Sequence, residues 1–366
     1  MTIREYYTYK PDYTVHPGEY LEEILEAREV KKKDLSDRIG ISVKHLSQII
    51  NKQAMLTSEL SVQLERTLGI SANIWNHLNA DYSLFEARKK ELKELKSKKE
   101  WIKQFPIKDL KKNGYLPQIN DSEILIEKLL AFFGIPSPEQ WQLYYAQRAV
   151  NFRKSETFKG KLEHVSAWLR AGEMEASTIE VTQHFNKDMF KENLFEIRKL
   201  TTQKPQVFVK EMKRLCAESG IILVFIPEFE GTYISGATRW LTPEKALIIM
   251  SLRHKTNDHF WFTFFHEAGH VLLHSKKNVF IDNDNPKGFE SKEEEEANRF
   301  AANYLIPELE YTQFINTKRF TQKDIEAFAK KVGIHPSILV GRLQREKKIP
   351  YSWLNGLKEH FEWKNK

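Results

Sequence analysis

The chain has 366 residues, which is too long for one ordinary hydrophobic core, so two or three domains are expected. Hydrophobic residues make up 41% and charged residues 29%, which is the balance of an ordinary globular protein. The longest apolar run is far shorter than the roughly 20 residues that span a bilayer, so we expect no contact with a membrane.

The single cysteine, Cys216, excludes an internal disulfide bond and a thiolate metal cluster. The first ten residues lack the apolar core of a secretory signal, and both features favour a cytoplasmic protein whose metal ligands are His and carboxylate side chains. The net charge is +7, and the basic excess is concentrated in residues 81–120. This lysine run indicates either a solvated helix face or an arm that contacts phosphates.

Apolar spacing predicts five short helices over residues 16–80, the last of which begins near 72 and continues as a long charged helix to Pro106. Residues 122–190 are also predicted to be helical. A helix over about 206–217 then precedes three β-rich runs, and helices return from 259 to the end. The β-rich runs are 221–226, 233–241 and 246–252. The predicted fold class is α+β, mostly α, with a small sheet near the C-terminus.

Residues 32–52 have the pattern of a helix-turn-helix. Leu35 and Ile39 lie on one helix face, Gly40 permits a tight turn, and Ser42 is a good N-cap for the next helix. The second helix is predicted to enter the major groove of DNA. The donor-rich side chains expected to contact DNA are Ser42, Lys44, His45, Ser47, Gln48 and Asn51. The alternative is a small helical bundle without a ligand, which the near-neutral charge of residues 1–80 favours slightly.

The segment HPGEYLEEIL at 16–25, this helix pair and LERTLGISANIWNHLNADY at 64–82 resemble the HigA-type antidote proteins of the XRE-like repressor family. The resemblance implies a lambda-repressor-like helical domain that binds palindromic double-stranded operators as a homodimer. Two departures stand out. Ser36 replaces a small apolar residue, and Lys52 replaces the glycine that usually closes the recognition helix, which puts the geometry of that helix end in question.

The run FWFTFFHEAGHVLLH at 260–274 contains an HExxH motif. His266 and His270 are four residues apart, so both imidazoles project from one helix face and can share a metal ion. Glu267 is placed to take a proton from an attacking water and pass it to a leaving amine. His274 continues the same stripe and is expected to pack beside the ligands rather than join them.

A zinc site needs a third protein ligand, and the candidates are the glutamates of SKEEEEANRFAANYLIPE at 291–308. Glu294 shares a helix face with the apolar Ala297 and Ala301, whereas Glu296 is expected on the far side. The alternative is that all four glutamates form a solvated first turn, which the helix dipole favours.

The two motifs together resemble the ImmA/IrrE metallopeptidase family over about 195–345. The resemblance implies that His266, His270 and Glu294 bind Zn²⁺ in a zincin-like domain and that Glu267 is the general base. Members of that family cleave repressor proteins.

These predictions combine into three ranges: a DNA-binding domain at 10–82, a helical connecting region at 83–190 and a zinc metallopeptidase domain at 191–345. The favoured hypothesis is a transcriptional regulator with a zinc-dependent endopeptidase that cleaves a repressor or another regulatory protein. One alternative is a DNA-binding regulator with a non-catalytic metal site. Another is a HigA-like antitoxin that binds a toxin, although the length of the chain weighs against a simple antitoxin.

Overall fold

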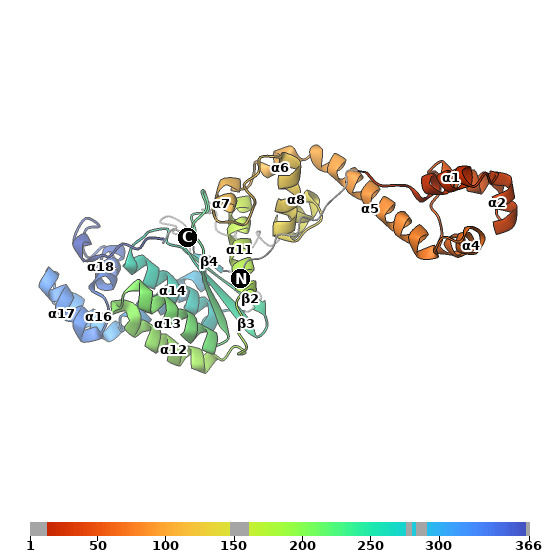
Figure 1. Ribbon diagram of the computed structural model, residues 1–366. Helices are drawn as coiled ribbons and strands as arrows, with labels where there is room; N and C mark the ends of the chain where they lie inside the picture. Colours follow the sequence, from red (N-terminus) through yellow and green to blue (C-terminus); the bar gives the residue numbers. More distant parts are fainter. Residues whose placement is uncertain (1–12, 147–160, 276–279, 283–290, 364–366) are drawn as a thin grey trace. The chain divides into compact units, whose positions relative to one another are not determined.

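The computed structural model describes residues 13–146, 161–275, 280–282 and 291–363 (Figure 1). The chain divides into two compact units, Met1–Lys98 and Lys99–Lys366. Helices dominate both units, and one small sheet lies in the second, so the predicted α+β, mostly α fold class is confirmed.

The described part of the first unit contains five helices around one apolar core, in the middle of which Trp75 is fully buried. They are α1 (Pro17–Ala27), α2 (Lys32–Ile39), α3 (Val43–Ile50), α4 (Ser58–Leu68) and α5 (Ala72–Lys96). Gly40 ends α2 with a left-handed φ of +71°, and Ser42 caps α3 by accepting a hydrogen bond from the backbone N–H of His45. The predicted helix-turn-helix geometry is therefore present.

Lys52 follows α3 in the left-handed conformation, with φ of +61°. Glycine adopts this conformation without steric cost, which explains why the resembling family uses glycine at this position. Lysine adopts it here while its ammonium pairs with Glu19, a side chain that also accepts from the backbone N–H of His16 and completes the capping box of α1. The substitution therefore leaves the end of α3 in the glycine-like geometry.

The predicted long helix is shorter than expected, because α5 ends at Lys96 rather than near Pro106. The Ser97 hydroxyl donates to the carbonyl of Glu94, and a serine side chain that bonds the local backbone in this way competes with helix propagation. A short helix, α6 (Lys99–Ile102), follows.

The second unit places further helices on either side of its sheet (Figure 1). Before the sheet come α7 (Ile107–Lys112), α8 (Ser122–Phe133), α9 (Pro138–Trp141), a π-helical turn (Gln142–Ala146), α11 (Leu162–Ser177), α12 (Lys187–Lys199), a 3-10 turn (Leu200–Thr202) and α13 (Pro205–Glu218). The strands are β1 (Ile221–Phe225), β2 (Gly236–Thr242), β3 (Lys245–Met250) and β4 (Phe280–Asp282). The later helices are α14 (Asn257–Leu273), α15 (Lys292–Leu305), α16 (Glu308–Asn316), α17 (Gln322–Val332), α18 (Pro336–Arg345) and a 3-10 turn (Asn355–Leu357).

The strand order is β1-β3-β2-β4, with β1 and β3 parallel and the other neighbours antiparallel. Side chains alternate between the two faces of the sheet, so Ile222 and Val224 pack toward α11 while Ile221 and Leu223 pack toward α13 and α14. The prediction of helices alone after residue 259 is wrong at β4. This strand has three residues, too few for an alternating pattern in the sequence.

The helices predicted for 122–190 are present where the structure describes them, but they do not stand apart from the sheet. Helix α11 lies directly on β3, since a side chain at Gly172 would collide with Ile249. The predicted connecting region is divided between the two compact units, with residues 83–98 in the first and the following residues in the second. The stretch 155–160, whose residues also indicate a turn between the predicted helices, lies outside the described residues.

The C-terminal segment holds the beginning of α14. The backbone N–H of Asn257 donates to the carbonyl of Glu359 over 3.0 Å, and the N–H of Phe361 donates to Lys255. Beside them, the Lys358 ammonium lies 2.6 Å from the buried Asp258 carboxylate. The helix that carries the HExxH motif is thus fixed at its N-terminal end.

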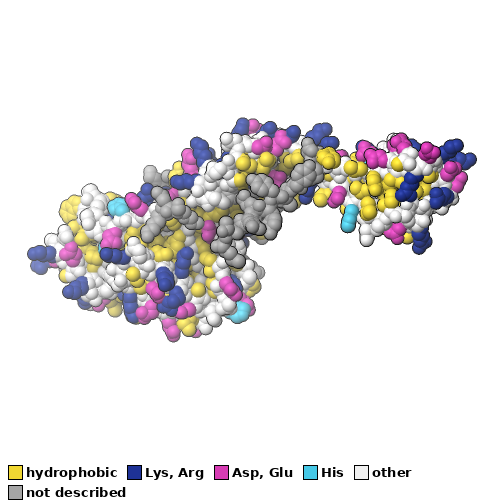
Figure 2. All heavy atoms as spheres, viewed as in Figure 1, with side chains coloured by type: hydrophobic (Ala, Val, Ile, Leu, Met, Phe, Trp, Pro, Cys, Tyr) yellow, Lys and Arg dark blue, Asp and Glu magenta, His cyan; other side chains and the backbone are white. Residues whose placement is uncertain are grey.

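Among the described residues, no helix combines the length and apolar character required to cross a membrane. Figure 2 shows acidic and basic side chains interspersed over the visible face of the second unit.

Candidate metal centre and candidate nucleic-acid interface

Helix α14 carries His266, Glu267 and His270 in the middle of the second unit, and all three residues are at most 1% exposed. The helix is apolar on nearly all sides, with Trp261, Phe264 and other aromatic residues in the core between the sheet and the later helices. Burial of three ionisable side chains in such a setting is costly unless they bind one another or an ion.

Helix α15 brings Glu294 to these histidines. Ser291 caps the helix by accepting a hydrogen bond from the backbone N–H of Glu294. Ala297 is buried, so the side of the first helical turn that carries it faces α14. The two helices approach closely at Gly269, because a Cβ there would lie 3.3 Å from the Cα of Ala297. The absence of a side chain at Gly269 therefore sets the spacing between the two halves of the site.

The donor atoms of His266, His270 and Glu294 converge on one point. The two Nε2 atoms lie 2.9 Å apart, and the Glu294 carboxylate oxygens lie 3.1 Å from Nε2 of His266 and 3.4 Å from Nε2 of His270. The structure thus brings the three predicted ligands together, and among the described residues they form the one group that could hold a metal ion.

The outer nitrogens of both histidines have partners of their own. His266 Nδ1 lies 3.1 Å from the amide oxygen of Asn298, and His270 Nδ1 lies 2.9 Å from Nδ1 of His274. His274 in turn lies 3.3 Å from the Glu296 carboxylate. Such partners fix the orientation of metal-binding imidazoles.

The expectation that Glu296 lies on the far side of α15 is wrong. Its carboxylate is half-buried and reaches His274 at the end of α14. The two helices cross at close range, so more than one side of α15 lies against α14. Glu296 does not join the three converging donors, but it is linked to His270 through His274.

Glu267 points toward the sheet rather than toward α15. The Thr238 hydroxyl on β2 donates to Oε2 of Glu267 over 2.6 Å, and Thr238 is itself 1% exposed. Gly236, two residues earlier on the same strand, leaves room for the carboxylate, since a Cβ there would lie 2.7 Å from Oε1. Strand β2 therefore both binds Glu267 and makes space for it.

The surroundings favour the ionisation states that a metal requires. Burial alone would raise the pKa of Glu294, but the hydrogen bonds of His266 and His270 outweigh it and hold the pKa well below its usual range. Burial lowers the pKa of His270 to about 4, despite the opposing effect of Glu294. A carboxylate beside a neutral imidazole is the ligand state that binds metals.

This donor set fits zinc. Two imidazole nitrogens and one carboxylate oxygen form a common catalytic ligand set for zinc, with a fourth position left for water or substrate. The interior position of the donors and the bonds on their outer nitrogens match the requirements of a preformed site.

The candidate DNA-contacting residues lie along α3 and at its two ends. Ser42, Lys44 and Asn51 are exposed, whereas His45, Ser47 and Gln48 are half-buried. Leu46, Ile49 and Ile50 point into the core, so the polar face is turned to the solvent. The base and phosphate contacts of these residues stay a prediction.

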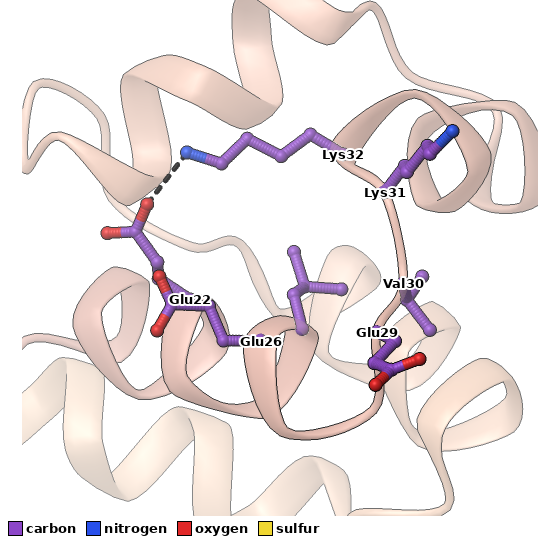
Figure 3. Close-up of a pocket in the computed structure, with 7 residues that line it drawn as sticks. Glu22, Glu26, Glu29, Val30, Lys31 and Lys32 are labelled. Carbon is purple, nitrogen blue, oxygen red and sulfur yellow. Dashed lines mark hydrogen bonds and ion pairs between the residues drawn. The ribbon is translucent and has the colours of Figure 1, made fainter.

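A hollow of about 330 Å³ between α1 and α2 is lined by side chains of both charges. Figure 3 shows the Lys32 ammonium turned toward Glu22, 2.7 Å away, while Glu29 lies at the other end of the hollow beside Val30. Because Lys31 and Lys32 line the hollow together with the glutamates, its charge favours no side of this unit for a nucleic acid.

Sequence reasoning missed several residues of the metal centre. Thr238 and Gly236 are far from α14 in the sequence, and no periodicity marks a strand residue that faces the buried Glu267. Asn298 did carry a signal, because it shares the face of α15 that includes Glu294, one turn earlier.

Two segments of the chain match known protein families. Residues 217–344 match the peptidase family described as the IrrE N-terminal-like domain, and residues 21–75 match the helix-turn-helix family. Both resemblances inferred from the motifs are thereby confirmed. The chain combines a helix-turn-helix regulator domain with a peptidase-family domain.

Three individual proteins are similar to about a fifth of the chain each. An Escherichia coli (strain K12) protein, the uncharacterized HTH-type transcriptional regulator YddM, is 29% identical over 73 residues, which cover 20% of this chain and 78% of that protein. The Pseudomonas aeruginosa antitoxin HigA, solved with the higBA promoter, is 26% identical, with 22% of this chain and 90% of that chain covered and a TM-score of 0.22. An addiction module antidote protein of the HigA family from Coxiella burnetii is 25% identical, with 23% and 91% covered and a TM-score of 0.21.

Proposed function

We propose, from a chain that joins a helix-turn-helix domain to an IrrE N-terminal-like peptidase domain, that this protein is a DNA-binding regulator with a zinc-dependent endopeptidase activity. His266, His270 and Glu294 hold the zinc ion, and Glu267 is the general base. The substrate is a protein, and a repressor is the substrate that best suits a regulator.

Zinc bound by these three residues supplies a Lewis acid that polarises a peptide carbonyl and makes water acidic enough to react near neutral pH. Glu267 accepts a proton from the attacking water and delivers it to the amide nitrogen as the C–N bond breaks. Thr238 holds the Glu267 carboxylate by one oxygen, which restricts its rotation. The products are a new carboxylate and a new amine.

The observation that carries this proposal is the convergence of three donor atoms beside a buried glutamate. A purely structural zinc site is closed by four protein ligands, whereas only three groups converge here among the described residues. A glutamate fixed next to such a site is the arrangement expected of a hydrolase.

Incubation of the full-length protein with purified candidate repressors tests the activity. The zinc-loaded wild type should produce defined fragments, and Glu267→Gln should produce them about two orders of magnitude more slowly or not at all. The catalytic assignment is wrong if Glu267→Gln cleaves as fast as the wild type.

In the same proposal, residues 10–82 bind a double-stranded operator as a homodimer through α3, and residues 191–345 cleave the protein substrate. The support is the match of residues 21–75 to the helix-turn-helix family and the solvent-facing polar side of α3. Residues 83–190 connect the two activities, and α11 from this range also covers one face of the sheet.

A further inference from the structure

A half-buried aromatic side chain lies one helical turn before the first histidine. Phe262 and His266 share a face of α14, and their ring centroids are 6.4 Å apart. The neighbouring Trp261, Phe264 and Phe265 are fully buried, whereas Phe262 is not. Phe262 therefore borders the candidate metal centre and stays partly open to solvent.

An arginine from α18 covers part of Phe262. The guanidinium carbon of Arg345 lies 4.4 Å from the centroid of the Phe262 ring. Helix α18 packs along α14, so both side chains extend from elements that are fixed relative to each other. A guanidinium over an aromatic ring uses its flat face for that contact and leaves its in-plane N–H donors available.

The other arginine in this part of α18 has a different role. Arg342 donates to the carbonyls of Ala302 and Ile306 at the end of α15, over 2.9 and 3.0 Å, and pairs with Glu346. The N–H donors of Arg342 therefore stabilise the packing of α18 on the end of α15. Arg345 is exposed, and within the part of the chain that the structure describes no carboxylate lies at ion-pair distance from it.

The two ends of the row of histidines present their cations differently. At the far end of α14, His274 and Lys292 both pair with Glu296, and Arg299 lines a hollow together with that glutamate. At the near end, Arg345 rests on the ring of Phe262, next to His266. An arginine presents several donors in a fork that matches a carboxylate.

We propose that Arg345 binds a carboxylate of the protein substrate and makes the site specific for an acidic peptide. This inference rests on the proposed peptidase function. The carboxylate belongs either to an Asp or Glu side chain near the scissile bond or to the C-terminus of the peptide, and both present the same chemistry to Arg345.

Three pools of short peptides test the inference: one with a single Asp or Glu, one without charged side chains and one with a single Lys or Arg. Each pool is used with a free and with an amidated C-terminus. Zinc-loaded wild type should cleave the acidic pool with a kcat/KM about tenfold higher than the neutral pool. Arg345→Glu should reverse the preference toward the basic pool.

Lys348→Glu is the matched control, because it makes the same charge change just beyond α18 without a contact to Phe262, and its preference should equal that of the wild type. A fall in the kcat/KM of all pools on amidation identifies the terminal carboxylate, and a preference for the acidic pool among the amidated peptides identifies a side chain. Equal kcat/KM for all pools with either terminus, or an equal effect of Lys348→Glu, overturns the inference while the peptidase function stands.

The binding of the same pools to the zinc-loaded Glu267→Gln variant distinguishes a failure of the peptidase activity from a failure of carboxylate binding by Arg345. If no pool is cleaved by the wild type, the proposed function fails. The dissociation constants then decide the inference alone: tighter binding of acidic peptides that Arg345→Glu abolishes supports it, and equal binding of all pools contradicts it.

Discussion

At the scale of single residues, each ring nitrogen of the two histidines in the candidate centre faces a polar neighbour. The Nε2 atoms of His266 and His270 face Glu294, while their Nδ1 atoms face Asn298 and His274. Each imidazole is thus fixed in its rotation before a metal arrives. This arrangement predicts that different glutamates of α15 contribute to metal binding to different degrees.

Three isosteric substitutions on α15 should separate these contributions. Glu296→Gln disturbs only the outer partner of His274 and should weaken zinc by about tenfold, the lower range for such partners. Glu294→Gln removes a donor that faces both histidines and should weaken zinc much more. The exposed Glu295 is the control, and Glu295→Gln should leave the affinity unchanged.

Zinc affinity measured by competition with a chromophoric chelator checks this series. If Glu296→Gln loses zinc while Glu294→Gln keeps it, the choice of the third ligand is wrong, although a zinc site on α14 could then be completed by the other glutamate.

Thr238 should act on catalysis through Glu267 without affecting the metal. Thr238→Val keeps the shape but removes the hydroxyl that donates to Oε2, so kcat should fall by about ten- to a hundredfold as the carboxylate loses its fixed orientation. Zinc content and KM should change little. Thr238→Ser should restore most of kcat, and a serine variant as slow as the valine variant would contradict the role of the hydroxyl.

At the scale of elements, α14 depends on the C-terminal segment that holds its first turn. Asp258 is 5% exposed and is paired with Lys358, and a Cβ at Gly341 would lie 2.6 Å from its carboxylate, so α18 also packs against it. A buried carboxylate that loses its partner is left as an uncompensated charge in the interior.

Lys358→Met should therefore destabilise the second unit by about 3–5 kcal/mol. Addition of Asp258→Asn to the same chain should recover much of this loss, because it removes the unpaired charge. Urea unfolding followed by near-ultraviolet circular dichroism measures the difference. A Lys358→Met variant as stable as the wild type would show that the pair contributes nothing to holding α14.

The same pair predicts a pH dependence. Burial alone would raise the pKa of Asp258, but the hydrogen bonds of His259 and Lys358 hold it below its usual range. The stability contributed by the ionised carboxylate is thus complete above its ordinary pKa and is lost as the pH falls below about 4. Asp258→Asn should lack this component, so the gap in unfolding free energy between it and the wild type should narrow on acidification.

Helix α3 should carry the specific part of DNA binding. Gln48→Ala or Asn51→Ala should cost about 1–3 kcal/mol on a specific site if the side chain contacts a base edge, with little effect on non-specific binding. Selection of binding sites from random DNA, followed by titration at fixed salt, provides the measurement. The absence of any preferred sequence would contradict this role of α3.

At the scale of the whole molecule, the sequence predicted most where the periodicity was long and regular. The helix-turn-helix was predictable because Gly40 and Ser42 mark the turn and the cap between two apolar faces. The closeness of His266 and His270 was predictable because a helix fixes the geometry of residues four apart. Glu294 could be selected because Ala297 and Ala301 identify the buried face of α15.

The remaining features depend on contacts between distant segments. Thr238 meets Glu267 only once β2 lies beneath α14, and Arg345 meets Phe262 only once α18 packs along the same helix. Residues 83–190 were predicted to be a connector because their helices carry no chemical motif. Within the described part of this range, apolar side chains from Phe105 onward pack on one face of the sheet, which local patterns do not reveal.

A toxin partner stays a prediction of the antitoxin alternative. That role leaves the convergent donors of α14 and α15 without a function.

The zinc content of the full-length protein, purified without chelator, tests the central claim most directly. Elemental analysis should find one zinc ion per chain in the wild type and in Glu267→Gln, and almost none in His266→Ala or His270→Ala, because only the latter two remove donors. If the wild type contains no divalent metal and takes up none when zinc is added, the proposed metal centre is wrong.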